Sequence, residues 1–152
     1  MGNELIYKKI TFIKDSLGKL KRILNFRKEE KDPEKKEFLL LSAEKKAEEI
    51  IESAIKINQT ILKEEFNHFS ESYYDSFMDL EKLEIFEADS LEKLAKTAGF
   101  RNRLAYDYMD LDEKIVGKTL ENILKIYPDY LLKIIDRIGK SKKSGIETLK
   151  ID

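Results

Sequence analysis

The chain has 152 residues, of which 41% are hydrophobic and 39% are charged, and its net charge is −1. This length predicts one domain with a normal core, and the near-neutral balance means that any nucleic-acid site must be a local basic patch. The absence of cysteine excludes a disulfide framework and a thiolate zinc site, and no apolar run is long enough for a transmembrane helix or a secretory signal. We therefore expect a cytoplasmic protein.

A first helix is predicted over residues 4–25, because apolar residues recur there at helical spacing. These residues form one stripe: Ile6, Ile10, Ile13, Leu17, Leu20 and Leu24. The opposite face is basic, a pattern also found in helices that bind membranes or RNA; it carries Lys8, Lys14, Lys21 and Arg22. We favour the simpler interpretation, in which this face is solvated and the stripe packs in the core.

A second, longer helix is predicted over residues 33–66. Asp32 and Pro33 mark its start, because proline is tolerated in the first turn of a helix. Its apolar stripe has alanines in the middle, and small side chains permit close approach of neighbouring helices. The stripe consists of Leu39, Ala43, Ala47, Ile50, Ala54, Ile57 and Ile61. We expect this segment to be the central helix of a bundle.

Two further helices follow along the chain. One is predicted over residues 71–86, and its apolar positions include Tyr74, Phe77, Met78 and Leu80. Asp89 and Glu92 are then spaced as the cap and third residue of a capping box built on Asp. This signal predicts a fourth helix over residues 90–108.

Asp110 and Glu113 repeat the capping-box spacing and predict a fifth helix over residues 111–138. Pro128 lies inside that helix, so we expect a kink or a break beside it, and Gly139 is expected to end the helix. The predicted architecture is thus an all-α, antiparallel bundle of about five helices. We expect a single domain over residues 1–139 and a polar tail over residues 140–152.

The most informative stretch is residues 99–112, which reads GFRNRLAYDYMDLD. It holds two of the five arginines of the chain, Arg101 and Arg103, and arginine can grip a phosphate with a bidentate fork. The stretch resembles the signature of the HepT ribonuclease toxins of the HEPN superfamily, in which Arg, four residues, His, one residue and Tyr form the active-site string. Arg101 and Tyr108 match this string, whereas Tyr106 occupies the position of the catalytic His.

The resemblance implies a ribonuclease toxin of a two-component toxin–antitoxin pair, which cleaves RNA without metal or cofactor. It also implies a homodimer with the site in a cleft between the protomers. There Arg101 would stabilise charge on the phosphate, and the residue at position 106 would take a proton from the ribose 2′-hydroxyl. Positions 101 and 106 lie about 140° apart around an ideal helix. Either the helix ends near Tyr106, or two motifs meet across a dimer interface.

Tyr106 changes the acid–base chemistry of this site. A free tyrosine has a pKa near 10, so roughly one molecule in a thousand is ionised at pH 7. Loss of a general base costs about 10²–10⁴-fold in rate, and we expect an attenuated nuclease. The sequence leaves open whether Tyr106 is natural, engineered or selected during cloning. The alternative is a catalytically inactive HEPN protein that binds RNA or a nucleotidyltransferase.

Tyr108 is a candidate modification site. The resemblance implies that an MntA-like nucleotidyltransferase antitoxin silences the toxin by transferring AMP onto the tyrosine of this string. The added negative charge and bulk would repel RNA from a phosphate site; the alternative is an interfacial tyrosine that packs on Arg101 or Leu104. Asn102 and Arg103 are further candidates for RNA contact, and Arg103 also fits a solvated or ion-paired residue.

Other candidate sites are weaker. His68 is the only histidine, and we expect a surface or half-buried residue without a catalytic role. Tyr73 and Tyr74 could stack on bases, but aromatic residues at helical spacing are expected in the core. No glycine-rich phosphate loop is present, so the chain is not itself the nucleotidyltransferase. We expect no magnesium at three alternating acidic positions near the fifth helix, Asp107, Asp110 and Asp112.

Overall fold

The computed structural model describes residues 2–106 and 113–141, and it describes side chains for residues 3–100 and 114–139. Over this part of the chain it contains five α-helices, one short 3-10 helix and no strand. The elements are α1 (Gly2–Glu29), α2 (Pro33–Phe66), α3 (Tyr73–Met78), η1 (Asp79–Leu83), α4 (Ala88–Tyr106) and α5 (Glu113–Ser141). The prediction of an all-α bundle of about five helices is confirmed.

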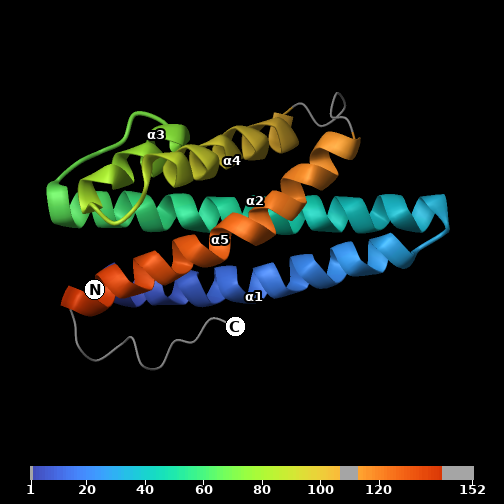
Figure 1. The fold of residues 1–152 in the computed structure, drawn as a ribbon, viewed down its shortest axis with the longest axis horizontal. Helices are drawn as coiled ribbons and strands as arrows, with labels where there is room; N and C mark the ends of the chain where they lie inside the picture. The colour runs from blue at the N-terminus through green and yellow to red at the C-terminus, as the bar shows by residue number, and fades with distance from the viewer. Residues whose placement is uncertain (1, 107–112, 142–152) are drawn as a thin grey trace.

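The central element of the bundle is α2, as predicted. It contacts α1, α3, η1, α4 and α5. Figure 1 shows α1 and α2 as a long antiparallel pair, with α4 along one side of α2. From the end of α4, α5 crosses α2 and runs back towards the start of α1 (Figure 1). This arrangement brings the beginning of α5 close to the end of α1.

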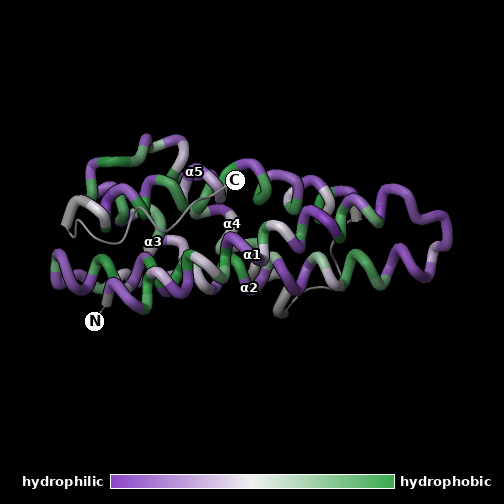
Figure 2. Tube along the Cα trace, turned by 90° about the horizontal axis from the view of Figure 1, so that it is seen from below, coloured by the Kyte–Doolittle hydropathy of each residue, from purple (hydrophilic) through white to green (hydrophobic). Residues whose placement is uncertain are grey.

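The stripe predicted for the first helix is buried along the whole of α1. The helix is longer than predicted at both ends, since it begins at Gly2 and continues to Glu29. Its last turn carries Arg27 and Lys28, and basic side chains there interact favourably with the negative end of the helix dipole. Figure 2 shows the strongly hydrophilic stretch in which α1 ends and α2 begins.

Both ends of α2 are fixed by local hydrogen bonds. At the start, the Asp32 carboxylate accepts from the Lys35 amide at 3.1 Å, and Pro33 occupies the first turn. At the end, Asn67 adopts a left-handed conformation with φ 50°, and its amide donates to the Lys63 carbonyl at 3.0 Å. The predicted bounds of this helix are therefore confirmed, and its predicted stripe is buried except for Leu39, which is half-buried.

The third predicted helix is wrong as a continuous element. The structure has a six-residue α3 and then η1, which is followed by Glu84 with a positive φ of 57°. The tighter 3-10 turn places two buried residues three positions apart, Leu80 and Leu83, on one face. The Asp79 carboxylate, at the start of η1, accepts hydrogen bonds from the loop that follows α2. The burial of Leu80 and Leu83 and the hydrogen bonds to Asp79 therefore outweigh the preference of this segment for a continuous α-helix.

The capping box predicted at Asp89 is also wrong. The fourth helix begins at Ala88, two residues before the predicted start, so that Asp89 lies inside its first turn. There its carboxylate forms an ion pair with Lys93 at 3.2 Å, and Glu92 pairs with Lys96 at 3.4 Å. An acidic residue stabilises the start of a helix either as its cap or, through the helix dipole, from inside its first turn. The spacing of Asp89 and Glu92 is therefore compatible with both the predicted and the observed start of this helix.

The break predicted at Pro128 does not occur, because α5 is helical from Glu113 to Ser141. Proline removes one backbone hydrogen bond, but Tyr127 and Tyr130 on either side are fully buried and hold the segment in place. The helix also continues past Gly139, where we expected it to end. The predicted cap residue Asp110 and most of the predicted tail, residues 142–152, lie outside the described residues.

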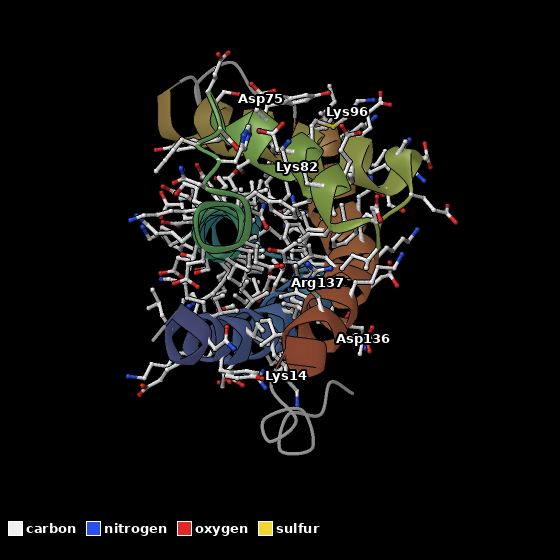
Figure 3. The ribbon with its side chains drawn as sticks, turned by 90° about the vertical axis from the view of Figure 1, so that its left-hand side faces the viewer. Lys14, Asp75, Lys82, Lys96, Asp136 and Arg137 are labelled. Atoms are coloured by element: carbon white, nitrogen blue, oxygen red, sulfur yellow. The ribbon has the colours of Figure 1, made fainter. Side chains whose placement is uncertain are left out.

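A cluster of aromatic side chains lies in the core where α5 meets the other helices. Tyr130 lies beside Phe77, Phe86 and Tyr127, with ring centroids 5.7–6.2 Å apart. Its hydroxyl donates to the Asn58 side chain at 2.6 Å. Further along α5, Arg137 pairs with Glu65 of α2, and Figure 3 shows Arg137 between the helices at this end of the bundle. These contacts fix α5 against the other helices.

Candidate functional site

The predicted site residues fall at the end of α4. Arg101, Asn102, Arg103 and Tyr106 all belong to its last two turns. Tyr108 lies outside the described residues, as do three acidic positions that we considered for magnesium, Asp107, Asp110 and Asp112. The structure therefore places the backbone of the Arg101–Tyr106 segment on a helix that is anchored by its preceding turns.

The anchoring face of α4 is apolar and buried. It consists of Leu91, Leu94, Ala95, Ala98 and Phe100. This face packs on α2, α3, η1 and α5. Because the side chains of the preceding turns are closely packed, the turns that carry Arg101 and Tyr106 project from a rigid element, which suits a site that must hold a phosphate in a fixed position.

A buried pair of hydroxyls ties α4 to α5 one turn before Arg101. The Thr97 hydroxyl donates to the Leu94 carbonyl at 2.6 Å, and it lies 2.7 Å from the Tyr127 hydroxyl. Since the single Thr97 proton is already used, Tyr127 is the donor in this pair. Burial raises the pKa of Tyr127 well above its ordinary value, and the hydrogen bond to Thr97 acts in the opposite direction. The sequence analysis missed this pair, because its members are distant in the chain.

The helix keeps a regular period as far as Tyr106, so positions 101 and 106 keep the separation of about 140° expected for an ideal helix. By that period, position 101 continues the face of Leu94 and Ala98, which is buried. Position 106 lies midway between Gly99, which is exposed, and Ala95, which is buried, about 20° from each around the helix. The two positions that the motif requires in one site thus fall on different faces of α4.

The exposed face of α4 is open at Gly99, two turns before Tyr106. A side-chain carbon added at Gly99 would meet no atom within 4 Å outside its own helix backbone. The same face carries Lys96, one of the exposed lysines labelled in Figure 3. A ligand or a second protein chain therefore has access to this side of the helix.

His68 lies at the other end of the bundle, after the end of α2 and beside η1, whereas the motif lies at the far end of α4 (Figure 1). Its Nε2 is 2.7 Å from the Asp79 carboxylate, and the Ser70 hydroxyl donates to the same oxygen at 2.7 Å. His68 and Ser70 both form hydrogen bonds with the same oxygen of Asp79 and not with each other. His68 therefore does not activate Ser70 as the histidine of a Ser-His-Asp triad would. The expectation of a half-buried histidine is confirmed.

Tyr73 and Tyr74 are exposed, which corrects the expectation that they pack in the core. They occupy the first turn of α3, whose buried residues are Ser76 and Phe77. Within the described ranges, no group of three or more acidic or histidine side chains is arranged to hold a metal ion. Nor does any described helix combine the length and apolarity needed to cross a membrane.

Comparison with solved structures defines the class of fold. The chain superposes on a tri-AMPylated HEPN toxin of Shewanella oneidensis, solved in complex with an MNT antitoxin, with a TM-score of 0.76. The match covers 86% of this chain and 96% of that chain at 22% sequence identity, a likeness that establishes the fold. The bundle therefore has the same fold as that toxin.

Sequence comparison defines the family. The family described as Ribonuclease HepT-like matches residues 13–138, and the chain belongs to that family. It is also 32% identical over 85 residues to the tRNA nuclease HepT of Aphanizomenon flos-aquae (strain 2012/KM1/D3). That alignment covers 56% of this chain and 58% of the relative, so the chain spans less than two thirds of the length of this curated relative. The resemblance inferred from the motif is confirmed.

Proposed function

We propose that this chain is the ribonuclease toxin of a toxin–antitoxin pair, which acts on RNA in the cytoplasm without a metal ion. The observation that carries the proposal is the position of Arg101 and Tyr106 on the packed helix α4 of a HepT-like bundle. The relative named tRNA nuclease HepT makes tRNA the first substrate to test.

The reaction needs a base and a cation. A base removes the proton of a ribose 2′-hydroxyl, and the freed oxygen attacks the adjacent phosphorus to form a 2′,3′-cyclic phosphate. The bond to the leaving 5′-oxygen breaks, and that oxygen takes up a proton. In this site Arg101 stabilises the charge that grows on the phosphate oxygens, with Asn102 and Arg103 as further RNA contacts. Tyr106 occupies the position of the base, and its phenol is almost wholly protonated at neutral pH. We therefore propose slow cleavage in this chain.

We further propose that the working form is a homodimer. Positions 101 and 106 lie about 140° apart around one α4, and the helix surface is open at Gly99, two turns before Tyr106. Arg101 from one protomer and Tyr106 from its partner can then address the same phosphate in a cleft between two copies. Size-exclusion chromatography with light scattering tests this step, and a monomer that cleaves RNA would contradict it.

The test of the nuclease function compares this chain with Tyr106→His on tRNA in the presence of a chelator. We expect the His variant to cleave about 10²–10⁴-fold faster, since it regains a base with a pKa near neutrality. Tyr106→Phe is the matched control, because it removes only the phenol hydroxyl. Arg101→Ala in the Tyr106→His background should abolish cleavage. Arg101→Lys keeps the positive charge but loses the two parallel hydrogen bonds of the guanidinium, so it tests which of the two cleavage requires.

Each outcome has a distinct meaning. Equal cleavage by this chain and Tyr106→His would show that the phenol supports catalysis, and the argument about the base would be wrong. Cleavage that survives Arg101→Ala would remove Arg101 from the site. If no variant cleaves but RNA binds, the second candidate function holds: a catalytically inactive HEPN protein that binds RNA or a nucleotidyltransferase. The observation that favours this candidate is Tyr106 itself.

We also propose that an MntA-like nucleotidyltransferase antitoxin silences the chain by transferring AMP to Tyr108. The support is that the structural neighbour is a tri-AMPylated toxin in complex with an MNT antitoxin. In the transfer, the Tyr108 oxygen forms a bond to the α-phosphorus of ATP, and pyrophosphate leaves. Mass spectrometry should show an addition of about 329 Da per group that Tyr108→Phe removes. Persistence of the addition in that variant would shift the modification to Tyr106.

A further inference from the structure

A pocket lies between the last turns of α2 and the loop that follows them, at the end of the bundle opposite to the motif (Figure 1). Its volume is about 280 Å³. The lining residues of α2 share one face of the helix, and the loop supplies the rest of the wall. The helix contributes Lys56, Gln59, Thr60 and Lys63, and the loop contributes His68, Phe69 and Ser70. We refer to this feature as the α2 end pocket.

Hydrogen bonds hold the loop wall of this pocket in place. The His68 amide donates to the Leu62 carbonyl at 3.0 Å, directly after the end of α2. The His68 ring and the Ser70 hydroxyl both bond the same oxygen of Asp79, each at 2.7 Å. Phe69 lies between these two anchored residues. The pocket is therefore formed in the free protein, and little ordering of the loop is needed when a ligand binds.

Phe69 presents its ring to solvent from this anchored loop. Among the described residues it is the most exposed of the large apolar side chains, at 67%. Within residues 3–100 and 114–139, no other aromatic ring contacts it. A single exposed apolar residue is common on protein surfaces, and it is the combination with two lysines that points to a ligand. An aromatic ring beside cations is the arrangement that stacks on the base of a nucleotide.

The α2 end pocket is cationic. Lys56 and Lys63 line it, and no carboxylate is among the lining residues. In the part of the chain that the structure describes, neither lysine forms an ion pair with an acidic side chain. The two lysines lie seven residues apart, which is about 10 Å along a helix. Their long, flexible side chains can therefore approach one phosphate group from two sides.

The hydroxyl groups of the lining serve as acceptors. The Thr60 hydroxyl donates to the Lys56 carbonyl at 2.8 Å, and the Ser70 hydroxyl donates to Asp79 at 2.7 Å. Each hydroxyl has a single proton, so both oxygens can only accept a further hydrogen bond. They therefore suit the hydroxyl groups of a ribose and not a phosphate. The exposed Gln59 amide can both donate to and accept from the edge of a base.

We propose that the α2 end pocket binds one nucleotide, whose base stacks on Phe69. The phosphate lies between Lys56 and Lys63, and the ribose hydroxyls donate to the oxygens of Thr60 and Ser70. The volume is near the lower limit of roughly 300–1,000 Å³ for small-molecule sites, which suits one nucleotide. A free nucleotide and a nucleotide of single-stranded RNA share this chemistry. The site is separate from the motif, so this inference does not rest on the proposed function.

The experiment follows the amide signals of residues 56–70 by NMR during titration with two probes. One probe is AMP, and the other is a single-stranded 2′-O-methyl oligoadenylate, which lacks the attacking hydroxyl. All variants carry Arg101→Ala, which removes the proposed phosphate contact at the motif. We expect Phe69→Ala to weaken binding about tenfold, within the range for one base stacked on an aromatic residue, and Phe69→Tyr to keep it. Phe38→Ala, at a side chain 59% exposed near the start of α2, is the matched control and should leave binding unchanged.

The lysines are tested in the same way. Lys63→Gln should weaken the binding of both probes. It should also reduce the slope of log affinity against log salt for the oligonucleotide by about 0.7, the value for one phosphate contact with a single strand. Lys45→Gln, at an exposed position of α2, is the matched control. Adenosine lacks the phosphate and inorganic phosphate lacks the base, so each should bind more weakly than AMP.

The outcomes separate the two sources of the nucleotide. AMP that binds as tightly as the oligonucleotide supports a site for free nucleotides, whereas an oligonucleotide that binds more tightly supports a site for an RNA strand. Inorganic phosphate that binds as well as AMP would overturn the assignment, and so would binding that Phe69→Ala leaves unchanged. Absence of binding by both probes overturns it as well, and is the outcome if the pocket takes an acidic protein.

Cleavage by the Tyr106→His chain, measured separately, distinguishes failure of this inference from failure of the proposed function. A chain that cleaves RNA but binds neither probe at residues 56–70 overturns the pocket and leaves the nuclease function intact. A chain that binds a probe there but never cleaves RNA supports the pocket and overturns the nuclease function.

Discussion

The hydroxyl pair between α4 and α5 allows a quantitative prediction. Thr97 donates to the Leu94 carbonyl and accepts from Tyr127, and both hydroxyls are buried. Tyr127→Phe removes one donor and leaves Thr97 bonded to its own helix. The free energy of unfolding should therefore fall by about 0.5–1.5 kcal/mol, the net value of one hydrogen bond.

Thr97→Val should cost more than Tyr127→Phe. Valine has the same branched shape, but the Tyr127 hydroxyl is then a buried donor without an acceptor, a loss of about 1–3 kcal/mol. In the double variant neither polar group remains, so its cost should be smaller than the sum of the two single costs by about 1 kcal/mol.

Urea unfolding at 25 °C measures all three variants, and the m-value should not change. Thr97→Val that costs less than Tyr127→Phe would refute the assignment of Tyr127 as the donor. Strict additivity in the double variant would show that the two hydroxyls do not interact in solution.

Three further predictions concern the rest of the bundle. Asp32→Ala should lower the free energy of unfolding by about 1 kcal/mol in urea titrations, with Asp32→Asn, which keeps a cap acceptor, as control. Ala54→Leu should lower the free energy of unfolding by about 1–3 kcal/mol, because Ala54 is fully buried where α5 crosses α2. The control Lys45→Leu, on the exposed face of α2, should not lower it. Burial raises the pKa of Tyr130, so folding disfavours its ionised form, and the free energy of unfolding should fall as the pH rises above about 10. Tyr130→Phe should make this fall less steep, and an unchanged dependence on pH would contradict the prediction.

The sequence predicted the helices best where one periodic stripe extended over many turns. The stripes of α1 and α2 are buried almost as predicted, and the Asp32 cap lies where the Asp-Pro pair indicated. Such features depend on spacing along one helix, which the sequence displays directly. For the same reason the motif placed Arg101 and Tyr106 on one helix, and its spacing alone gave the separation of the two positions.

Errors occurred where contacts between distant segments outweighed local preference. The predicted third helix divides into α3 and η1, where Leu80 and Leu83 pack three residues apart and Asp79 bonds the loop after α2. The helix continues through Pro128 because the aromatic residues beside it are buried among three other helices.

The sequence by itself determined the helical class, the central place of α2 and membership of the HepT-like family, since each rests on residues close together in the chain. Only the tertiary structure decided which distant side chains meet. The hydroxyl pair joins residues 30 positions apart, and the Tyr130–Asn58 bond joins residues 72 positions apart. Such contacts arise only when the helices pack, because burial of their apolar stripes fixes which faces come together.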